Sequence, residues 1–240
     1  GMGQLPAALA RTLPGAAIRT REPVAWIAPG RPYRVVAASG VEVAARAVVL
    51  AVPAAVAARL VAPFDATLAA ACAELRAVSS ATITLGYPRD RVSHPCRGMG
   101  FIVPRGEATR LLAVSWVSSK WAGRAPRDWV VLRAFAGGAF DADVLDQADD
   151  GLVAQTHAEL APLLGIDGLP TFARLHRWHD ASPQYEVGHL ARIARIGQQQ
   201  AQTPGLFVTG SAYRGVGMPD VIADARATAD RVCQWLEQGH

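Results

Sequence analysis

The sequence predicts an α/β protein in which a mostly antiparallel α+β block interrupts a domain built on a short parallel sheet. Two apolar runs indicate the parallel sheet, because strands buried on both faces of such a sheet read as continuous hydrophobic stretches. The first run covers residues 47–52 and the second covers residues 206–209. Residues 62–185 combine β-branched segments with helical spacing, which is typical of an antiparallel sheet with helices over one face.

The first quarter of the chain is expected to form a helix, a small antiparallel meander and one strand of the parallel sheet. Apolar side chains at helical spacing begin at Gln4, and Pro14 and Gly15 end this run. Pro53 ends the first apolar run and opens the next helix. The expected elements are helices at 4–12 and 54–60, meander strands at 18–27, 33–38 and 41–43, and the buried strand at 47–52.

The remaining elements complete a second domain and then return to the first. The expected helices are 65–75, 141–164 and 187–200, and the expected strands are 77–87, 101–103, 111–117, 129–135 and 171–178, before a closing strand and helix between 205 and 236. We therefore expect one domain from residues 1–61 with 186–240, and an inserted domain from residues 62–185.

Composition and charge exclude several classes of protein. No apolar run reaches the roughly 18 residues that a membrane span requires, and the first residues do not resemble a signal peptide. Three widely spaced cysteines indicate a reducing cytoplasm rather than a disulfide scaffold or a zinc site. The net charge is +4, and Lys120 is the only lysine. Without a dense basic run, we expect no nucleic-acid partner.

A glycine-rich crossing joins the second apolar run to the last helix. It contains Gly210, Gly215 and Gly217, and the helix begins near Pro219. A strand that passes through glycines into a helix N-terminus presents free backbone N–H groups, which suit an anionic or electron-rich ligand. An ordinary strand–turn–helix joint with tight packing has the same pattern, so the pattern alone leaves both readings open.

Four segments, in order along the chain, resemble bacterial protoporphyrinogen and coproporphyrinogen oxidases, which are FAD enzymes of the flavin amine oxidase superfamily. The segment at residues 206–220 reads LFVTGSAYRGVGMPD and resembles the flavin-contacting segment of that family. The other three are GFIVPRG at 100–106, SSKW with GRAP at 118–126, and PQYEVGHL at 183–190. Four ordered blocks over most of the chain are a specific signal, whereas one block alone is not.

The resemblance implies that residues 1–61 and 186–240 are part of an FAD-binding domain, and that residues 62–185 are a substrate-binding domain for a porphyrinogen. Val24 would contact the adenine of FAD through its backbone. Ser211 stands where many flavoproteins have an acid or amide at the ribityl chain, and its hydroxyl would do this more weakly. The backbone of Val216, Gly217 and Met218 would face the pyrimidine side of the flavin.

One part of the family pattern is missing from this sequence. The G-x-G-x-x-G fingerprint that would hold the FAD pyrophosphate is absent, so the chain resembles only the C-terminal half or somewhat more of the family. Without the first β-α-β unit, the strand at residues 47–52 should expose an apolar sheet edge. The chain is therefore expected to be a truncated product, to pair with a separate N-terminal half, or to have repacked as a dimer without flavin.

The residues offer no rival catalytic machinery. We find no Ser-His-Asp set, H-E-x-x-H motif, P-loop or metal cluster, and His176 and His179 around Trp178 do not have the usual spacing of metal ligands. His189 is expected to be structural. In flavin oxidases the cofactor supplies the redox chemistry, so no acid–base pair is required of the protein.

Two alternatives remain open from the sequence. The substrate of the same fold could be an amine or a polyene, since fold does not fix function. The chain could also be a non-catalytic domain that binds an apolar or tetrapyrrole ligand, or that self-associates. Arg97 and Arg177 could pair with porphyrin propionates or be solvated surface charges.

Overall fold

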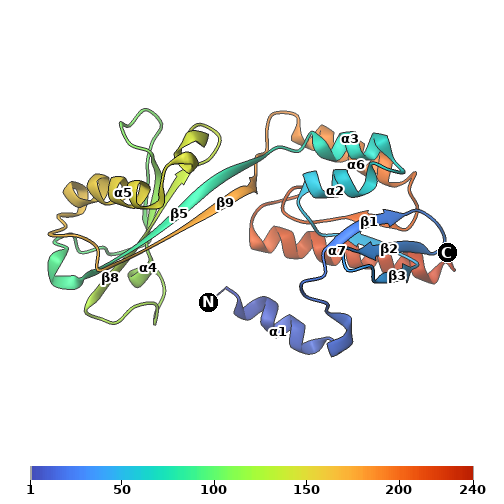
Figure 1. The fold of residues 1–240 in the computed structure, drawn as a ribbon, viewed down its shortest axis with the longest axis horizontal. Helices are drawn as coiled ribbons and strands as arrows, with labels where there is room; N and C mark the ends of the chain where they lie inside the picture. Colours follow the sequence, from blue (N-terminus) through green and yellow to red (C-terminus); the bar gives the residue numbers. More distant parts are fainter. Residues whose placement is uncertain (1, 240) are drawn as a thin grey trace. The chain divides into compact units, whose positions relative to one another are not determined.

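The computed structural model describes residues 2–239, with the side chains of all of them except Ala16 and Ala142. The chain divides into two compact units (Figure 1). Unit 1 contains residues 1–75 and 187–240, and unit 2 contains residues 76–186. The first boundary therefore lies after Leu75 and not after residue 61, because the helix at Ala66–Ala73 buries Leu68 and Cys72 in the core of unit 1.

Unit 1 contains a small antiparallel sheet, a two-stranded parallel sheet and helices around them. The antiparallel sheet has the order β1-β2-β3, and β4 pairs in parallel with β10 as predicted. The elements are α1 (Gln4–Thr12), a 3-10 turn (Gly15–Ala17), β1 (Val24–Ala28), β2 (Tyr33–Ala37), β3 (Glu42–Ala45), β4 (Val48–Leu50), α2 (Ala54–Val61), α3 (Ala66–Ala73), α6 (His189–Gln200), β10 (Leu206–Val208) and α7 (Met218–Glu237).

The first predicted strand is shorter than expected. Pairing of β1 with β2 begins at Val24, whereas the prediction placed the start of the strand at Ile18. A 3-10 turn ends at Ala17, and Arg21 has a positive φ of 59°, so the backbone is not regular before Pro23. The β-branched content of residues 18–24 could not reveal this break.

The strand β4 is buried on one face only. Val48 and Leu50 lie in the core of unit 1 with Leu206 and Val208, but the Val49 side chain is 43% exposed. On β10, the residue paired with Val49 is Phe207, which is buried. The prediction of a strand buried on both faces is therefore wrong at Val49, because no layer in the described part of the chain covers that side of β4.

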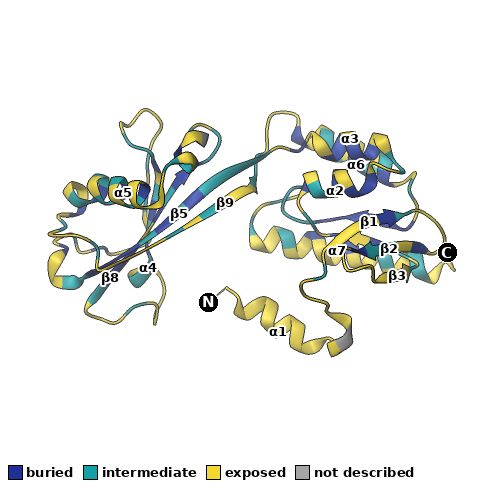
Figure 2. Cartoon of the chain, in the orientation of Figure 1, coloured by how far each residue is buried: buried dark blue, intermediate teal, exposed yellow. Residues whose placement is uncertain are grey.

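Unit 2 is a five-stranded antiparallel sheet with the order β6-β7-β8-β5-β9 and with α5 over one face. Buried residues alternate with exposed or half-buried ones along the central strands (Figure 2). The elements are β5 (Ala77–Pro88), a 3-10 turn (Arg89–Arg91), β6 (Gly100–Ile102), β7 (Leu111–Trp116), α4 (Val117–Lys120), β8 (Trp129–Gly137), a 3-10 helix (Ala142–Asp146), α5 (Asp149–Leu164) and β9 (Phe172–Pro183).

The helix predicted at residues 141–164 is two elements. A 3-10 helix ends at Asp146, and α5 begins only at Asp149 because Gln147 and Ala148 are extended. The guanidinium of Arg177 holds this break, since it donates hydrogen bonds to the carbonyls of Leu145 (3.0 Å) and Gln147 (2.5 Å) and pairs with the Asp149 carboxylate.

The chain enters and leaves unit 2 on neighbouring strands. β5 and β9 pair from Ala77 with Pro183 to Gly86 with Phe172. Beyond the strands, the Gln184 N–H donates to the Arg76 carbonyl at 2.9 Å. The two connections of unit 2 to unit 1 are therefore held side by side.

Candidate functional site

The glycine-rich crossing between β10 and α7 requires glycine at more than one position. Gly210 and Gly215 have φ values of +122° and +145°, which side chains of other residues rarely allow. A Cβ atom at Gly215 would lie 2.3 Å from the Cβ of Asp220, and one at Gly217 would lie 2.9 Å from its Oδ2. The crossing therefore packs closely against the first turn of α7, in which Pro219 also lies.

The buried carboxylate of Asp224 ties the crossing to α7. Its Oδ2 accepts a hydrogen bond from Thr209 Oγ1 at 2.7 Å, and its Oδ1 accepts one from Arg214 Nη1 at 2.9 Å. The Gly210 N–H approaches the same carboxylate at 3.5 Å. Burial favours the protonated acid, but the hydrogen bonds from Thr209 and Arg214 outweigh it and lower the pKa of Asp224 below its usual value.

Tyr213 anchors the middle of the crossing in the core of unit 1. Its side chain is 1% exposed, and its carbonyl accepts a hydrogen bond from His189 Nε2 at 2.8 Å. The Cys72 thiol is also fully buried in this core, and burial raises its pKa to about 11. His189 is thus engaged with the backbone of the crossing, which agrees with the structural role expected of it.

Four of the five residues predicted to contact a flavin lie in the crossing. Ser211 is in the turn after β10, Gly217 precedes α7, and Val216 and Met218 are 59% and 49% exposed apolar side chains beside it. Val24 lies on another element, at the first residue of β1, where it pairs with Ala37. The φ of Gly217 is −68°, so its close contact with Asp220, and not its φ, is what favours glycine there.

The residues that hold this loop in place were not predicted from the sequence. Thr209, Arg214 and Asp224 come together only when β10, the crossing and α7 fold against one another. The one available signal was an aspartate at a position of α7 that faces the core, four residues after Asp220.

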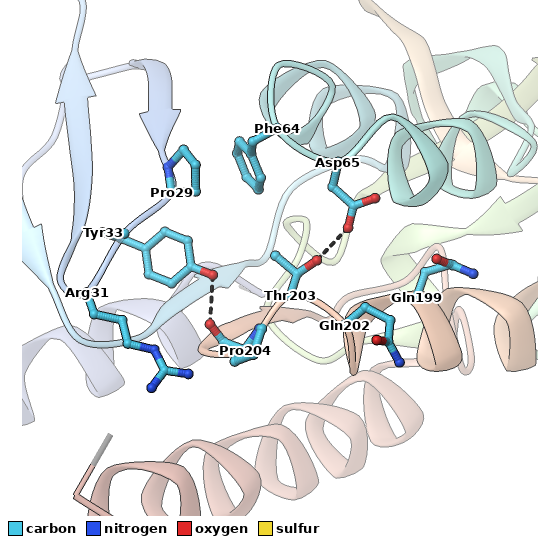
Figure 3. A pocket seen from close by; sticks show the side chains of 10 residues that line it. Pro29, Arg31, Tyr33, Phe64, Asp65, Gln199, Gln202, Thr203 and Pro204 are labelled. Carbon is cyan, nitrogen blue, oxygen red and sulfur yellow. Dashed lines mark hydrogen bonds between the residues drawn. The ribbon is translucent and has the colours of Figure 1, made fainter.

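A separate cavity of about 490 Å³ lies at the other end of β10, where the strand begins (Figure 3). Two hydrogen bonds join residues that line it. The Tyr33 hydroxyl donates to the Pro204 carbonyl at 2.8 Å, and the Thr203 hydroxyl donates to Asp65. Asp65 also accepts from the Leu68 N–H at 2.8 Å and so caps α3. These contacts hold α3 against the turn before β10.

The described residues contain no cluster of three or more His, Cys, Asp or Glu side chains that could hold a metal ion. The His176 ring packs edge-on against Trp178, with centroids 4.2 Å apart.

Between residues 2 and 239, no helix combines the length and the apolar character needed to span a membrane. Arg177 is neither a free surface charge nor available to a substrate carboxylate, because it holds the start of α5.

Comparison with known proteins identifies relatives for nearly all of the chain. The flavin containing amine oxidoreductase family matches residues 1–233. Coproporphyrinogen III oxidase of Bacillus subtilis is 32% identical over 163 residues, which are 68% of this chain and 35% of that protein. The enzyme of Propionibacterium freudenreichii is 36% identical over 189 residues, 78% of this chain and 35% of that protein.

Solved structures agree with this relationship. A crystal structure from Exiguobacterium sp. 255-15, assigned as a protoporphyrinogen oxidase, has a TM-score of 0.81 and 31% identity over 92% of this chain and 48% of that one. Putrescine oxidase shares the fold, with a TM-score of 0.74 and 19% identity. The chain spans about a third of the length of the two curated relatives named above. It belongs to the flavin containing amine oxidoreductase family.

Proposed function

We propose that the chain is the C-terminal part of an FAD-dependent oxidoreductase that oxidises a porphyrinogen, as the names of its relatives suggest for them. The observation that carries the proposal is the glycine-rich crossing. Its glycines let the backbone lie close to the start of α7. The Asp224 carboxylate of α7 accepts a hydrogen bond from Thr209 and so holds the crossing in place. Such a preformed backbone surface at a helix N-terminus suits the electron-rich edge of a flavin.

The residues of the crossing fit the cofactor. The main chain of Val216, Gly217 and Met218 would face the pyrimidine ring, and the Ser211 hydroxyl would bond the ribityl chain. Val24 would bind the adenine through the main chain of β1. When bound, FAD accepts the hydride from the substrate. The contribution of this chain is to hold the ring in one orientation and to keep a nonpolar surface, Val216 and Met218, beside it.

The free edge of the parallel sheet supports a position for an N-terminal segment. On the outer edge of β10, the Val208 N–H donates to the buried Gln200 side chain at 3.2 Å, and the Leu206 N–H donates to the Thr203 carbonyl at 3.2 Å. That edge is therefore closed. The other edge of the described sheet belongs to β4, beside the exposed Val49. We propose that a strand of an N-terminal G-x-G-x-x-G segment pairs with β4 and completes the cofactor site.

Reconstitution tests this proposal. The chain is co-expressed with the N-terminal segment of a coproporphyrinogen oxidase relative, and the purified complex is expected to carry flavin absorbance and to oxidise coproporphyrinogen. The chain alone should bind FAD weakly or not at all. A complex that forms but takes up no flavin would contradict the proposal, and tight FAD binding by the chain alone would contradict the need for a second segment.

The exposed edge of β4 also supports a second candidate, a non-catalytic domain that self-associates as a homodimer. A chain that is dimeric, colourless and unresponsive to both FAD and the N-terminal segment would favour it. Either function fits a cytoplasmic protein, since the three cysteines are unpaired and two of them are buried.

A further inference from the structure

The face of the unit 2 sheet opposite α5 carries polar and charged side chains along its central strands. Successive side chains of a strand point to opposite faces, so the register of β5, β8 and β9 shows which residues share that face. We call it the open face and define it by Thr82, Thr84, Arg133, Arg174, His176 and Trp178. All six are half-buried or exposed, whereas the intervening residues Ile83, Leu132 and Ala134 are completely buried.

Two arginines stand on either side of the central strand of the open face. Thr84 of β5 pairs with Arg133 of β8 on one side and with Arg174 of β9 on the other. Their backbones are therefore two strand spacings, or about 10 Å, apart. Both side chains are exposed, and neither has an ion pair or a hydrogen bond to a described side chain.

The open face holds no charge that would neutralise these arginines. None of the alternating positions from Phe172 to Trp178 on β9, or of the residues paired with them on β5, is acidic. The neighbouring Arg177 shows the contrast, because it points to the other face and is fully engaged there by Asp149 and two carbonyls. Unpaired guanidinium groups are thus a property of the open face, and they attract anions, carboxylates above all.

Aromatic rings lie next to the arginines. The row beside Arg133, Thr84 and Arg174 contains Phe135, Thr82 and His176. Trp178 follows, packed edge-on against His176, and the residue is 45% exposed although its Nε1 donates to Thr82 Oγ1 at 3.2 Å. The open face therefore combines two cations at fixed separation with a broad, partly apolar aromatic surface.

We infer that Arg133 and Arg174 bind two carboxylates of one flat ligand that lies on the open face, with Trp178 and His176 against its ring system. That the ligand is a tetrapyrrole rests on the proposed function, since propionate groups around a macrocycle provide carboxylates at such a separation. Each guanidinium can bind a carboxylate through two parallel hydrogen bonds, and a lysine cannot reproduce this geometry. The pair thereby determines specificity for polycarboxylate ligands.

Binding of coproporphyrin III to the 240-residue chain tests the inference without flavin or turnover. Quenching of tryptophan fluorescence gives the Kd. Arg133→Gln and Arg174→Gln are each expected to raise the Kd about tenfold, as loss of one charge-assisted pair does. Arg174→Lys should lie between wild type and Arg174→Gln. Thermal unfolding should not change in either variant, because neither side chain has a described partner.

Two controls make the result decisive. Arg97→Gln removes an exposed loop arginine of the same unit and should leave the Kd unchanged. The tetra-amide of coproporphyrin, which has no carboxylates, should bind wild type and both open-face variants equally weakly. An equal effect of Arg97→Gln, or equal discrimination of the amide by wild type and variants, would overturn the inference. Flavin uptake by the reconstituted complex is measured separately. The Kd values for coproporphyrin would therefore still test the inference if the proposed oxidase activity were not found.

Discussion

At the scale of single residues, Asp224 determines the geometry of the crossing. A carboxylate that is 7% exposed is costly to bury unless hydrogen bonds compensate, and here Thr209 and Arg214 supply them. The same bonds connect the end of β10, the loop and the second turn of α7. The backbone surface proposed to bind the cofactor thus depends on a side chain that would not itself touch the cofactor.

Asp224→Asn tests this role. Loss of the charge should lower the free energy of unfolding by about 1.5–3 kcal/mol at pH 7, as for hydrogen bonds to charged groups. The pKa of Asp224 is lowered in the folded state, so its contribution is present above the unfolded pKa of about 4 and is lost as the pH falls through the folded value. The gap between wild type and variant in urea unfolding should therefore narrow below pH 4.

The matched control for that variant is Asp230→Asn. Asp230 is exposed on the same helix and makes no ion pair or side-chain hydrogen bond with a described residue, so its substitution should have little effect at any pH. A constant gap for Asp224→Asn from pH 7 to pH 3 would show that the carboxylate is not ionised in the folded protein.

The variants Gly215→Ala and Gly210→Ala distinguish backbone strain from steric collision in the crossing. Both residues have positive φ, but only at Gly215 would the new Cβ collide with Asp220, at 2.3 Å. Gly210→Ala should cost about 1 kcal/mol through backbone strain, and Gly215→Ala should cost clearly more through the added collision. Chemical denaturation of the two variants measures the difference. Equal destabilisation would mean that α7 shifts freely to make room.

At the scale of elements, the local sequence pattern predicted some strands and helices correctly, whereas features that depend on long-range contacts could not be predicted. The apolar runs at β4 and β10 predicted a parallel pair although about 150 residues separate them. The prediction was possible because each strand carries the apolar residues that it buries in the core. The residues proposed to contact a flavin rest on the resemblance alone and stay a prediction. The sequence pattern could not show that the Val49 side chain is uncovered, that α5 begins only after Ala148, or that Arg177 holds that break. Each of these features depends on a segment distant in sequence.

The start of α3 offers a test at this scale. Asp65 is its N-cap and accepts hydrogen bonds from Leu68 N–H and from Thr203 before β10. Asp65→Ala should lower the free energy of unfolding by about 1–2 kcal/mol, because both donors lose their acceptor. Asp65→Asn keeps an acceptor oxygen and should cost only a few tenths. If the alanine variant were as stable as the asparagine variant, the cap would contribute nothing.

At the scale of the whole molecule, unit 2 has the features of an independent domain. It has its own hydrophobic core, which includes Ile83, Leu132 and Leu160, and its two ends are adjacent strands joined from Ala77 to Pro183. A domain that has its own apolar core and whose two ends lie side by side can be separated from the rest of the chain without exposing that core.

Residues 76–186 expressed alone should therefore fold, with one cooperative thermal transition and dispersed amide signals in NMR spectra. The matching deletion, in which a short Gly-Ser linker replaces these residues, should leave unit 1 folded. An unfolded 76–186 fragment would show that its core depends on contacts with the rest of the chain.

The Gln200 side chain, which satisfies the outer edge of β10, has a consequence for how copies of the chain can associate. A parallel sheet with two open edges could add strands without limit and grow into a fibre. With Val208 already bonded to Gln200, the edge of this two-stranded sheet that remains open among the described residues is that of β4. Two copies that met there would use the same surface and close a twofold, isologous dimer with no edge of that sheet left over. If copies of the chain associate through this sheet, the outer edge of β10, closed by Gln200 and the Thr203 carbonyl, would limit that association to two copies.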